Sequence, residues 1–366
     1  MKNMWPSVLL RSLLVCVFVV SFSLTSVGFL PNAHAGRDYL AVQTWGGQLG
    51  VAQEKAFFEP FAEETGIKVV NVEAGTDVGG KLAAMVRSGN IEWDMITGDY
   101  ESYNTKYYNK GLLEEIDYSI VTNTDDLVPG STKPWGVAQY LEGVCMVYSK
   151  KAFPEGKPQP SSYKDFFDVK KFPGPRAMHN WGGPHDNLSI ALMAEGASRD
   201  ELFPIDYDRA FKIMDKVKPH IKVWYTTGAQ LVQALLDEEV VMAISTDGRA
   251  KQAIQSGAPI EIVWNQSFYF LAYNCVVKNT PMREEIMRLI AYCNRPEQQA
   301  IFNNYIGYTP SNVKAIRYLH PTFAKQQSTH PDNIGKVFNF MMCKNSGWVA
   351  ESVEATDEKW NHWIAQ

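Results

Sequence analysis

The chain has 366 residues, of which 45% are hydrophobic and 20% are charged, and its formal net charge at pH 7 is −5. This composition is that of an ordinary globular protein and excludes collagen-like, coiled-coil and disordered classes. The acidic balance argues against a nucleic-acid-binding protein, and the length is sufficient for the cores of two domains.

The N-terminal segment has the pattern of an export signal. Lys2 and Arg11 precede an apolar run over residues 13–24, and Ala33 and Ala35 then occupy the small positions of an A-x-A cleavage site. We therefore expect residues 1–35 to form a signal peptide cleaved after Ala35, which would send the protein to the periplasm. An uncleaved membrane anchor is the alternative, and the A-x-A site disfavours it.

Strands and helices alternate along the first part of the remaining chain. The predicted elements are a strand at 39–45, a helix from 48 to Gly66, a strand at 67–74, a helix ending near Gly89 and a strand at 93–97. This alternation predicts right-handed βαβ units and a parallel sheet, which is an α/β fold.

A second alternation follows. After a strand that begins near Gly143, we expect helices at 186–196, 206–220, 228–239 and 248–257, strands at 221–227, 240–246 and 259–264, two helices broken at Pro296, and a C-terminal amphipathic helix.

Two α/β lobes are therefore expected. No low-complexity linker separates the two series, so strands crossing near 139–147 and 263–277 would join the lobes. The predicted boundaries are 36–141 plus 274–325 for lobe 1, and 142–273 plus 326–366 for lobe 2.

Several short motifs occur in a characteristic order: "TGIKV", "WDMI", "GAPIEIVW", "RPEQQAIFNNYIGYTPSN" and a tryptophan-bearing C-terminal helix. Together they resemble the periplasmic substrate-binding proteins of ABC transporters, and more specifically the spermidine/putrescine-binding group. The resemblance covers essentially the whole exported chain. It implies a type II periplasmic-binding-protein fold, in which a hinge of crossing strands joins two lobes around a ligand cleft.

The first lobe offers four candidate ligand-binding residues where its strands end. Trp45 precedes Gly46 and a second glycine, which would leave one face of the indole open, and the resemblance implies an aromatic ring here that stacks on an amine. Asp99 and Tyr100 follow the strand at 93–97, where the family contacts the amine. A helix N-cap is the alternative role for Asp99.

The second lobe offers five more candidates. Trp181 repeats the Trp-Gly-Gly arrangement, and Asp186 falls near an acidic ligand contact of the family or caps a helix. Tyr225 ends a strand and is a candidate wall of the cleft. After the next strand, Asp247 is expected to bind an ammonium, and Arg249 to pair with Asp247 or to hold a carboxylate.

The second predicted crossing supplies Phe268 and Tyr273 but no acid. Polyamine binders that this chain resembles usually present an aspartate in this stretch. Either Asp99, Asp186 or Asp247 takes its place, or the ligand carries less positive charge than a polyamine.

The resulting prediction is a receptor that closes two lobes over a small amine and delivers it to a membrane permease, as a monomer without cofactor, metal or nucleic acid. A polyamine such as putrescine or spermidine is the first choice of ligand, and a zwitterionic ω-amino acid is the alternative.

Two other readings of the same fold stay open. A thiamin-degrading type of enzyme would use Cys145 as its nucleophile, and a receptor for iron or another anion would use Tyr107 and Tyr108. The pairing of the cysteines that follow the signal segment is not defined by their spacing; they are Cys145, Cys275, Cys293 and Cys343.

Overall fold

The computed structural model describes residues 37–74, 77–180 and 184–366, which all belong to one compact unit. The predicted signal peptide and Trp181 lie outside these ranges. No helix within them is long and apolar enough to cross a membrane.

The strands are β1 (Tyr39–Thr44), β2 (Lys68–Glu73), β3 (Met95–Tyr100), β4 (Thr132–Lys133), β5 (Gly136–Ser149), β6 (Arg176–His179), β7 (Ile221–Tyr225), β8 (Met242–Thr246), β9 (Ile260–Val276), β10 (Thr309–Pro310) and β11 (Phe338–Asn339). The α-helices are α1 (Gly47–Gln53), α2 (Glu59–Thr65), α3 (Val78–Ser88), α4 (Glu101–Asn109), α5 (Tyr163–Phe167), α6 (His185–Ala194), α7 (Tyr207–Val217), α8 (Gly228–Leu236), α9 (Asp247–Gln255), α10 (Arg283–Cys293), α11 (Pro296–Ile306), α12 (Pro321–Lys325), α13 (Pro331–Ile334) and α14 (Gly347–Ile364).

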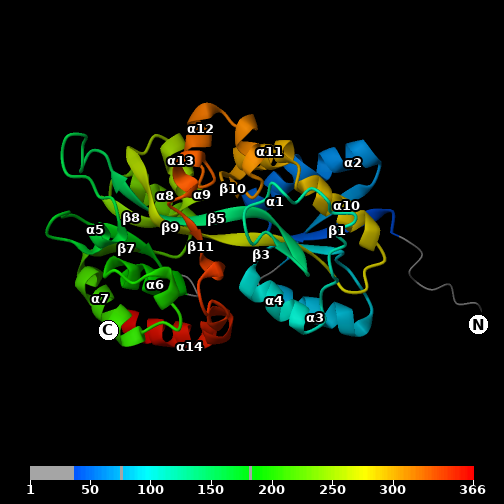
Figure 1. The fold of residues 1–366 in the computed structure, drawn as a ribbon, viewed down its shortest axis with the longest axis horizontal. Coiled ribbons are helices and arrows are strands. Elements are labelled where there is room, and N and C mark those ends of the chain that lie inside the picture. The colour runs from blue at the N-terminus through cyan, green and yellow to red at the C-terminus, as the bar shows by residue number, and fades with distance from the viewer. Residues whose placement is uncertain (1–36, 75–76, 181–183) are drawn as a thin grey trace, which may run out of the picture. The chain divides into compact units, whose positions relative to one another are not determined.

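All strands belong to one mixed sheet whose main order is β2-β1-β3-β9-β5-β8-β6-β7 (Figure 1). β1 pairs in parallel with β2 and β3, and β6 pairs in parallel with β7 and β8. β9 runs antiparallel to β3 and β5, and β5 runs antiparallel to β8. The parallel βαβ units are thus confirmed, and the two long strands β5 and β9 connect them where crossing strands were predicted.

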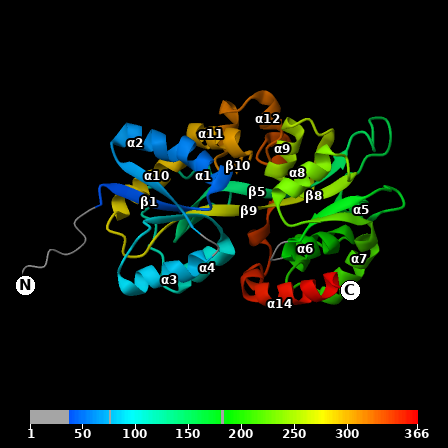
Figure 2. The same ribbon diagram turned by 180° about the vertical axis from the view of Figure 1, so that it is seen from behind.

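Helices cover both faces of the sheet (Figure 2). On the β1–β3 side, α1, α2, α10 and α11 pack on one face and α3 on the other. On the β6–β8 side, α5, α6, α7 and α14 share one core, and α8 and α9 share another. Each parallel group is therefore buried on both faces, as parallel sheets require. The exact lobe boundaries remain predictions.

The first helix is not regular throughout. The sequence predicts one helix from 48 to Gly66, but a π-helical segment at Glu54–Phe58 separates α1 from α2. Pro60, in the first turn of α2, has no amide hydrogen to donate to the preceding turn, so one regular helical hydrogen bond is missing where the π-helical segment meets α2. The positive φ of 74° at Gly66 ends the helix where the sequence predicted.

Candidate functional site

Two adjoining cavities lie where β1, β3, β6 and β8 end beside the crossing strand β5. They share Tyr100, Tyr103 and Glu142. The first, here called the aromatic compartment, has a volume of about 370 Å³ and is also lined by Trp45, Leu49, Val78, Gly98, Asp99, Tyr107, Tyr140 and Tyr308. The second, here called the helix-end compartment, measures about 130 Å³ and is also lined by Ser102, Val144, His185, Asp186, Thr246, Phe270, Phe340, Met341, Val349 and Val353. Carboxyl ends of strands are the usual ligand sites of open α/β sheets.

Trp45 lies at the rim of the aromatic compartment with 41% of its surface exposed. Gly98 makes room for its ring, and Gly46 makes room for the neighbouring Glu73 side chain. Gly98 has a φ of 89°, and a β-carbon there would lie 2.8 Å from the indole. Gly46 has a φ of 68°, and a β-carbon there would collide with the carboxylate of Glu73. The absence of a side chain at Gly98 therefore lets an accessible aromatic ring lie beside β3.

Asp99 forms part of the wall of the same compartment. A break in the pairing of β3 with β9 between Thr97 and Asp99 turns its side chain into the cavity lining. The residue is only 7% exposed, and its Oδ2 atom has no hydrogen-bond partner among the described residues. Burial raises the pKa of Asp99 to about 7, against the opposing hydrogen bond from Tyr107. A ligand ammonium would supply the missing partner.

Glu142 is the central acid of the site, and the sequence analysis missed it. It lies on β5, lines both compartments and accepts a hydrogen bond at Oε2 from the Tyr100 hydroxyl. Burial raises its pKa to about 7, the charge of Asp247 adds to this shift, and Arg249 opposes it. A single carboxylate within the apolar run "YLEGVCMVY" on a predicted crossing strand was the available signal.

Three helices begin at the helix-end compartment without a side-chain cap in the described part of the chain. Their N-cap residues are Tyr100 for α4, Pro184 for α6 and Thr246 for α9. Side chains of Asp77, Asp206 and Thr227 cap α3, α7 and α8, whereas α1, α5, α10, α11 and α14 also lack a side-chain cap among the described residues, so the missing caps alone do not distinguish this compartment. Free amides and the helix dipole at an N-terminus favour an anion.

Asp186 lines the helix-end compartment, as the sequence analysis expected of a cleft residue, but it already has protein partners. Its Oδ2 lies 2.8 Å from Nε2 of His179, and its Oδ1 accepts a hydrogen bond from the Asn187 amide. Its negative charge is therefore already engaged by these buried protein groups.

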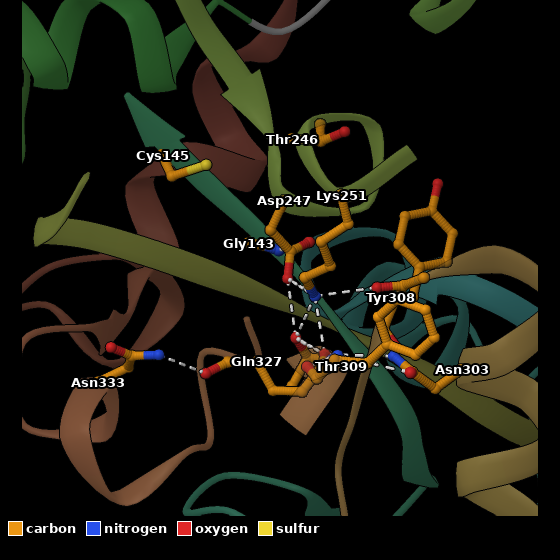
Figure 3. Close-up of polar contacts among 12 residues, drawn as sticks. Gly143, Cys145, Thr246, Asp247, Lys251, Asn303, Tyr308, Thr309, Gln327 and Asn333 are labelled. Carbon is orange, nitrogen blue, oxygen red and sulfur yellow. Dashed lines mark hydrogen bonds and ion pairs between the residues drawn. The ribbon is translucent and has the colours of Figure 1, made fainter. Parts of the chain in front are cut away.

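Asp247 and Arg249 line neither compartment. Asp247 is fully buried, with its Oδ2 2.8 Å from the ammonium of Lys251, so its carboxylate is engaged within the protein, which does not favour the expected binding of a ligand ammonium (Figure 3). Arg249 is half-buried, extends over Gly228 and donates from Nη1 to Gln252 at 2.9 Å. The expected pairing of Arg249 with Asp247 is not formed, because Lys251 occupies that role.

Three predicted aromatic wall residues are in the protein core instead. Tyr225 ends the outermost strand β7, and its hydroxyl donates to the Ile244 carbonyl at 2.9 Å. Phe268 packs against Phe340 with ring centroids 4.7 Å apart. Tyr273 lies opposite Asp99 on β9, and its hydroxyl donates to the Gly130 carbonyl at 2.8 Å. None of the three lines either compartment; Phe270, Tyr140 and Tyr308 do so instead.

Cys145 is buried in the core, and burial raises the pKa of its thiol. Its Sγ donates weakly to the Ser245 carbonyl at 3.6 Å. A thiol with this environment is a poor nucleophile. Cys145, Cys275, Cys293 and Cys343 are all free and buried, so these four form no disulfide with one another.

Comparison with known proteins adds an independent observation. The family model of bacterial extracellular solute-binding proteins matches residues 56–329. The chain is 31% identical over 350 residues to the gamma-aminobutyric acid-binding protein of Pseudomonas aeruginosa, covering 94% of this chain and 96% of the relative. It is 24% identical over 285 residues to the spermidine/putrescine-binding periplasmic protein of Salmonella typhimurium, covering 75% and 79% of the two chains. The solved structure of the Atu4243–GABA receptor superposes with a TM-score of 0.78 at 30% identity and covers 90% of this chain and 98% of that one.

Proposed function

This chain belongs to the family of bacterial extracellular solute-binding proteins, and we propose that its ligand is a small ω-amino acid. The resemblance to ABC-transporter substrate-binding proteins is confirmed, as is the two-lobe α/β fold shared by the similar solved structures. Such proteins bind a small molecule and deliver it to a membrane permease, and they are not enzymes. The family also agrees with a periplasmic location. Cleavage after Ala35 and a monomeric state remain predictions.

The observation that carries the ligand proposal is the contrast between the two compartments. The aromatic compartment offers an ammonium the unpartnered carboxylate oxygen of Asp99 and the exposed indole of Trp45. The helix-end compartment offers a carboxylate the uncapped start of α9 at Thr246 and the uncapped first turn of α4, which contains Ser102. A molecule with one charge of each sign satisfies both.

The arrangement also favours charges at opposite ends of a short chain. The two compartments meet at Tyr100, Tyr103 and Glu142, so the ammonium and the carboxylate would lie on either side of these residues. An α-amino acid carries both charges on one carbon and cannot reach both compartments with them. An ω-amino acid such as gamma-aminobutyric acid separates them by a short methylene chain.

A polyamine, the first choice from the sequence, is the second candidate. Asp99, Glu142 and Asp186 are three acids around the cavities, and the spermidine/putrescine-binding relative supports this ligand class. A diamine would place its second ammonium in the helix-end compartment. Asp186 is already engaged there by His179, and the starts of three helices would oppose a cation. These two features favour the zwitterion.

Isothermal titration calorimetry with four matched ligands tests the proposal: gamma-aminobutyric acid, putrescine, butylamine and butyrate. We expect gamma-aminobutyric acid to bind tightest, because the other three each lose one of the two charge complements, which costs about tenfold or more in affinity. Tighter binding of putrescine than of gamma-aminobutyric acid would overturn the ω-amino acid and favour the polyamine. An affinity for butylamine equal to that for gamma-aminobutyric acid would show that the helix ends do not bind the carboxylate.

A further inference from the structure

A buried ion pair lies directly behind the cleft (Figure 3). Lys251 is 1% exposed, and four oxygens lie within hydrogen-bonding distance of its three N–H donors: Asp247 Oδ2 at 2.8 Å, the Gly307 carbonyl at 2.9 Å, Thr309 Oγ1 at 3.0 Å and Gln327 Oε1 at 2.8 Å. Asp247 also accepts from the Gly143 amide at 3.0 Å and from the Thr309 hydroxyl at 2.8 Å. The pair is fully satisfied and fully desolvated.

Each backbone anchor of this pair adjoins a residue of the cleft wall. Asp247 follows Thr246 at the start of α9, and Gly143 follows Glu142 on β5. Gly307 and Thr309 flank Tyr308, which stacks on Tyr140 with ring centroids 4.9 Å apart. The network thus joins three wall segments that are far apart in the sequence.

The same network determines the net charge next to the residues that line the two compartments. Asp247 begins α9, and its carboxylate contacts the backbone next to Glu142, so an uncompensated negative charge would face the region assigned to the ligand carboxylate. The effect reaches the cavity, because Asp247 contributes to the raised pKa of Glu142. Charges act over longer range in a desolvated site than in water.

We propose that Lys251 is a specificity-determining positioning residue. By compensating Asp247 and joining α9 to the segment around Tyr308, it leaves the start of α9 available to a ligand carboxylate rather than to an ammonium. This inference rests on the proposed ω-amino acid ligand. It explains why an aspartate at the cleft end of β8 does not make the site a cation site.

Two single variants test the proposed role of Lys251. One leaves a buried negative charge without a partner, and the other leaves a buried positive charge without a partner. Lys251→Met leaves Asp247 uncompensated, whereas Asp247→Asn leaves Lys251 uncompensated and preserves the shape of the side chain. The measurement is the ratio of the affinities for gamma-aminobutyric acid and putrescine, by calorimetry, always against the unmodified protein at the same pH. Lys251→Met is measured at about pH 8, where an isolated carboxyl is better ionised. Asp247→Asn is measured at about pH 6, where an isolated ammonium better keeps its proton, because burial lowers the pKa of Lys251. We expect Lys251→Met to lower this ratio by about tenfold and Asp247→Asn to raise it, a change of about 1.4 kcal/mol per tenfold.

The double variant Asp247→Asn/Lys251→Met restores neutrality and should return the ratio toward that of the unmodified protein. Lys222→Met is the control, because it removes a lysine from an exposed ion pair with Glu239 and should leave the ratio unchanged. A purely structural role would weaken both ligands alike and leave every ratio unchanged, which would overturn the inference. If Lys251→Met does not fold, Asp247→Asn and the double variant still decide the sign.

The unmodified protein separates this inference from the proposed function. If it fails to bind gamma-aminobutyric acid, the ω-amino acid proposal falls, and this inference falls with it. If it binds gamma-aminobutyric acid and the ratios of the variants do not move in opposite directions, only the role of Lys251 is wrong.

Discussion

Trp45 is an exposed indole at the rim of the aromatic compartment, so it is expected to serve ligand binding more than stability. We predict that Trp45→Ala weakens gamma-aminobutyric acid binding by about 3- to 30-fold, from the loss of a cation–π contact of about 0.5–2 kcal/mol. The melting temperature without ligand should change little. Trp45→Phe retains a ring and should recover part of the affinity. A large fall in melting temperature with unchanged affinity would assign Trp45 to the core instead.

Asp99 makes ligand binding dependent on pH. Its pKa is raised to about 7 by burial, so the free protein holds a proton there at lower pH, and an ammonium must displace it. We predict that affinity for the amine falls as pH decreases through about 7, and that binding near this pH releases protons. Calorimetry in buffers of different ionisation enthalpy measures the release. Asp99→Asn should bind weakly and remove Asp99's share of the proton release.

The free energy of unfolding of the ligand-free protein should also depend on pH through Asp99. It should fall as pH rises, whereas the affinity for the amine increases. Because the pKa of Asp99 in the folded protein lies above the ordinary aspartate value of 3.8, the folded state binds a proton that the unfolded state has released between about pH 4 and about pH 7. This group therefore makes the free energy of unfolding decrease as pH rises through that window. Asp99→Asn should remove its contribution to the slope.

Single residues were only partly predictable. Trp45, Asp99, Tyr100 and Asp186 line the cavities because each lies at the end of a strand or in the segment after it, and strand ends are visible in a local pattern. Tyr225 also ends a strand but is buried, and Phe268 and Tyr273 are buried within β9, because the order of strands in the sheet and the face of each strand decide their surroundings. Glu142 was missed because it lies within a strand rather than at its end.

The start of α9 is the element that should recognise the ligand carboxylate. Thr246, its N-cap residue, lines the helix-end compartment and makes no side-chain capping hydrogen bond in the described structure. We predict that Thr246→Asp abolishes binding of gamma-aminobutyric acid, because the new carboxylate occupies the helix end, while the protein still folds, because an aspartate is a favoured N-cap residue.

Thr246→Asn is the matched control for this prediction. It has nearly the shape of the aspartate without its charge, so it should bind gamma-aminobutyric acid more tightly than Thr246→Asp. Calorimetry and thermal unfolding measure both effects. Equal affinities of the two variants would show that the ligand carboxylate does not approach α9.

The positions of the helices and strands were more predictable from the sequence than the surroundings of single residues or the register of the sheet. The helices and strands follow local periodicity, and Gly66 and Gly89 end helices with positive φ as expected. The π-helical segment before Pro60 was not expected, since it depends on one missing hydrogen bond within an otherwise regular helical pattern. Capping was not predictable either: Asp77, Asp206 and Thr227 cap helices, whereas the three helices at the cleft lack side-chain caps in the described residues.

At the scale of the whole molecule, two long strands explain how one sheet contains both groups of parallel strands, β1–β3 and β6–β8, with their helices. β5 and β9 run antiparallel to each other and lie between β3 and β8 in the sheet. Their length and apolar sequence made them recognisable as crossing strands. Their register was not predictable, because it depends on pairing between residues more than 100 positions apart, such as Gly143 with Tyr269. Whether Trp45 and Trp181 approach one another stays a prediction, because Trp181 lies outside the described residues.

The structure of the complex with gamma-aminobutyric acid tests the central claim most directly, since it places both charges of the ligand at once. The account predicts the ammonium within hydrogen-bonding distance of Asp99 and close to Trp45, and the carboxylate at the amides that begin α9. A carboxylate next to Asp99, or a ligand with both charges in one compartment, would contradict the assignment of the two compartments.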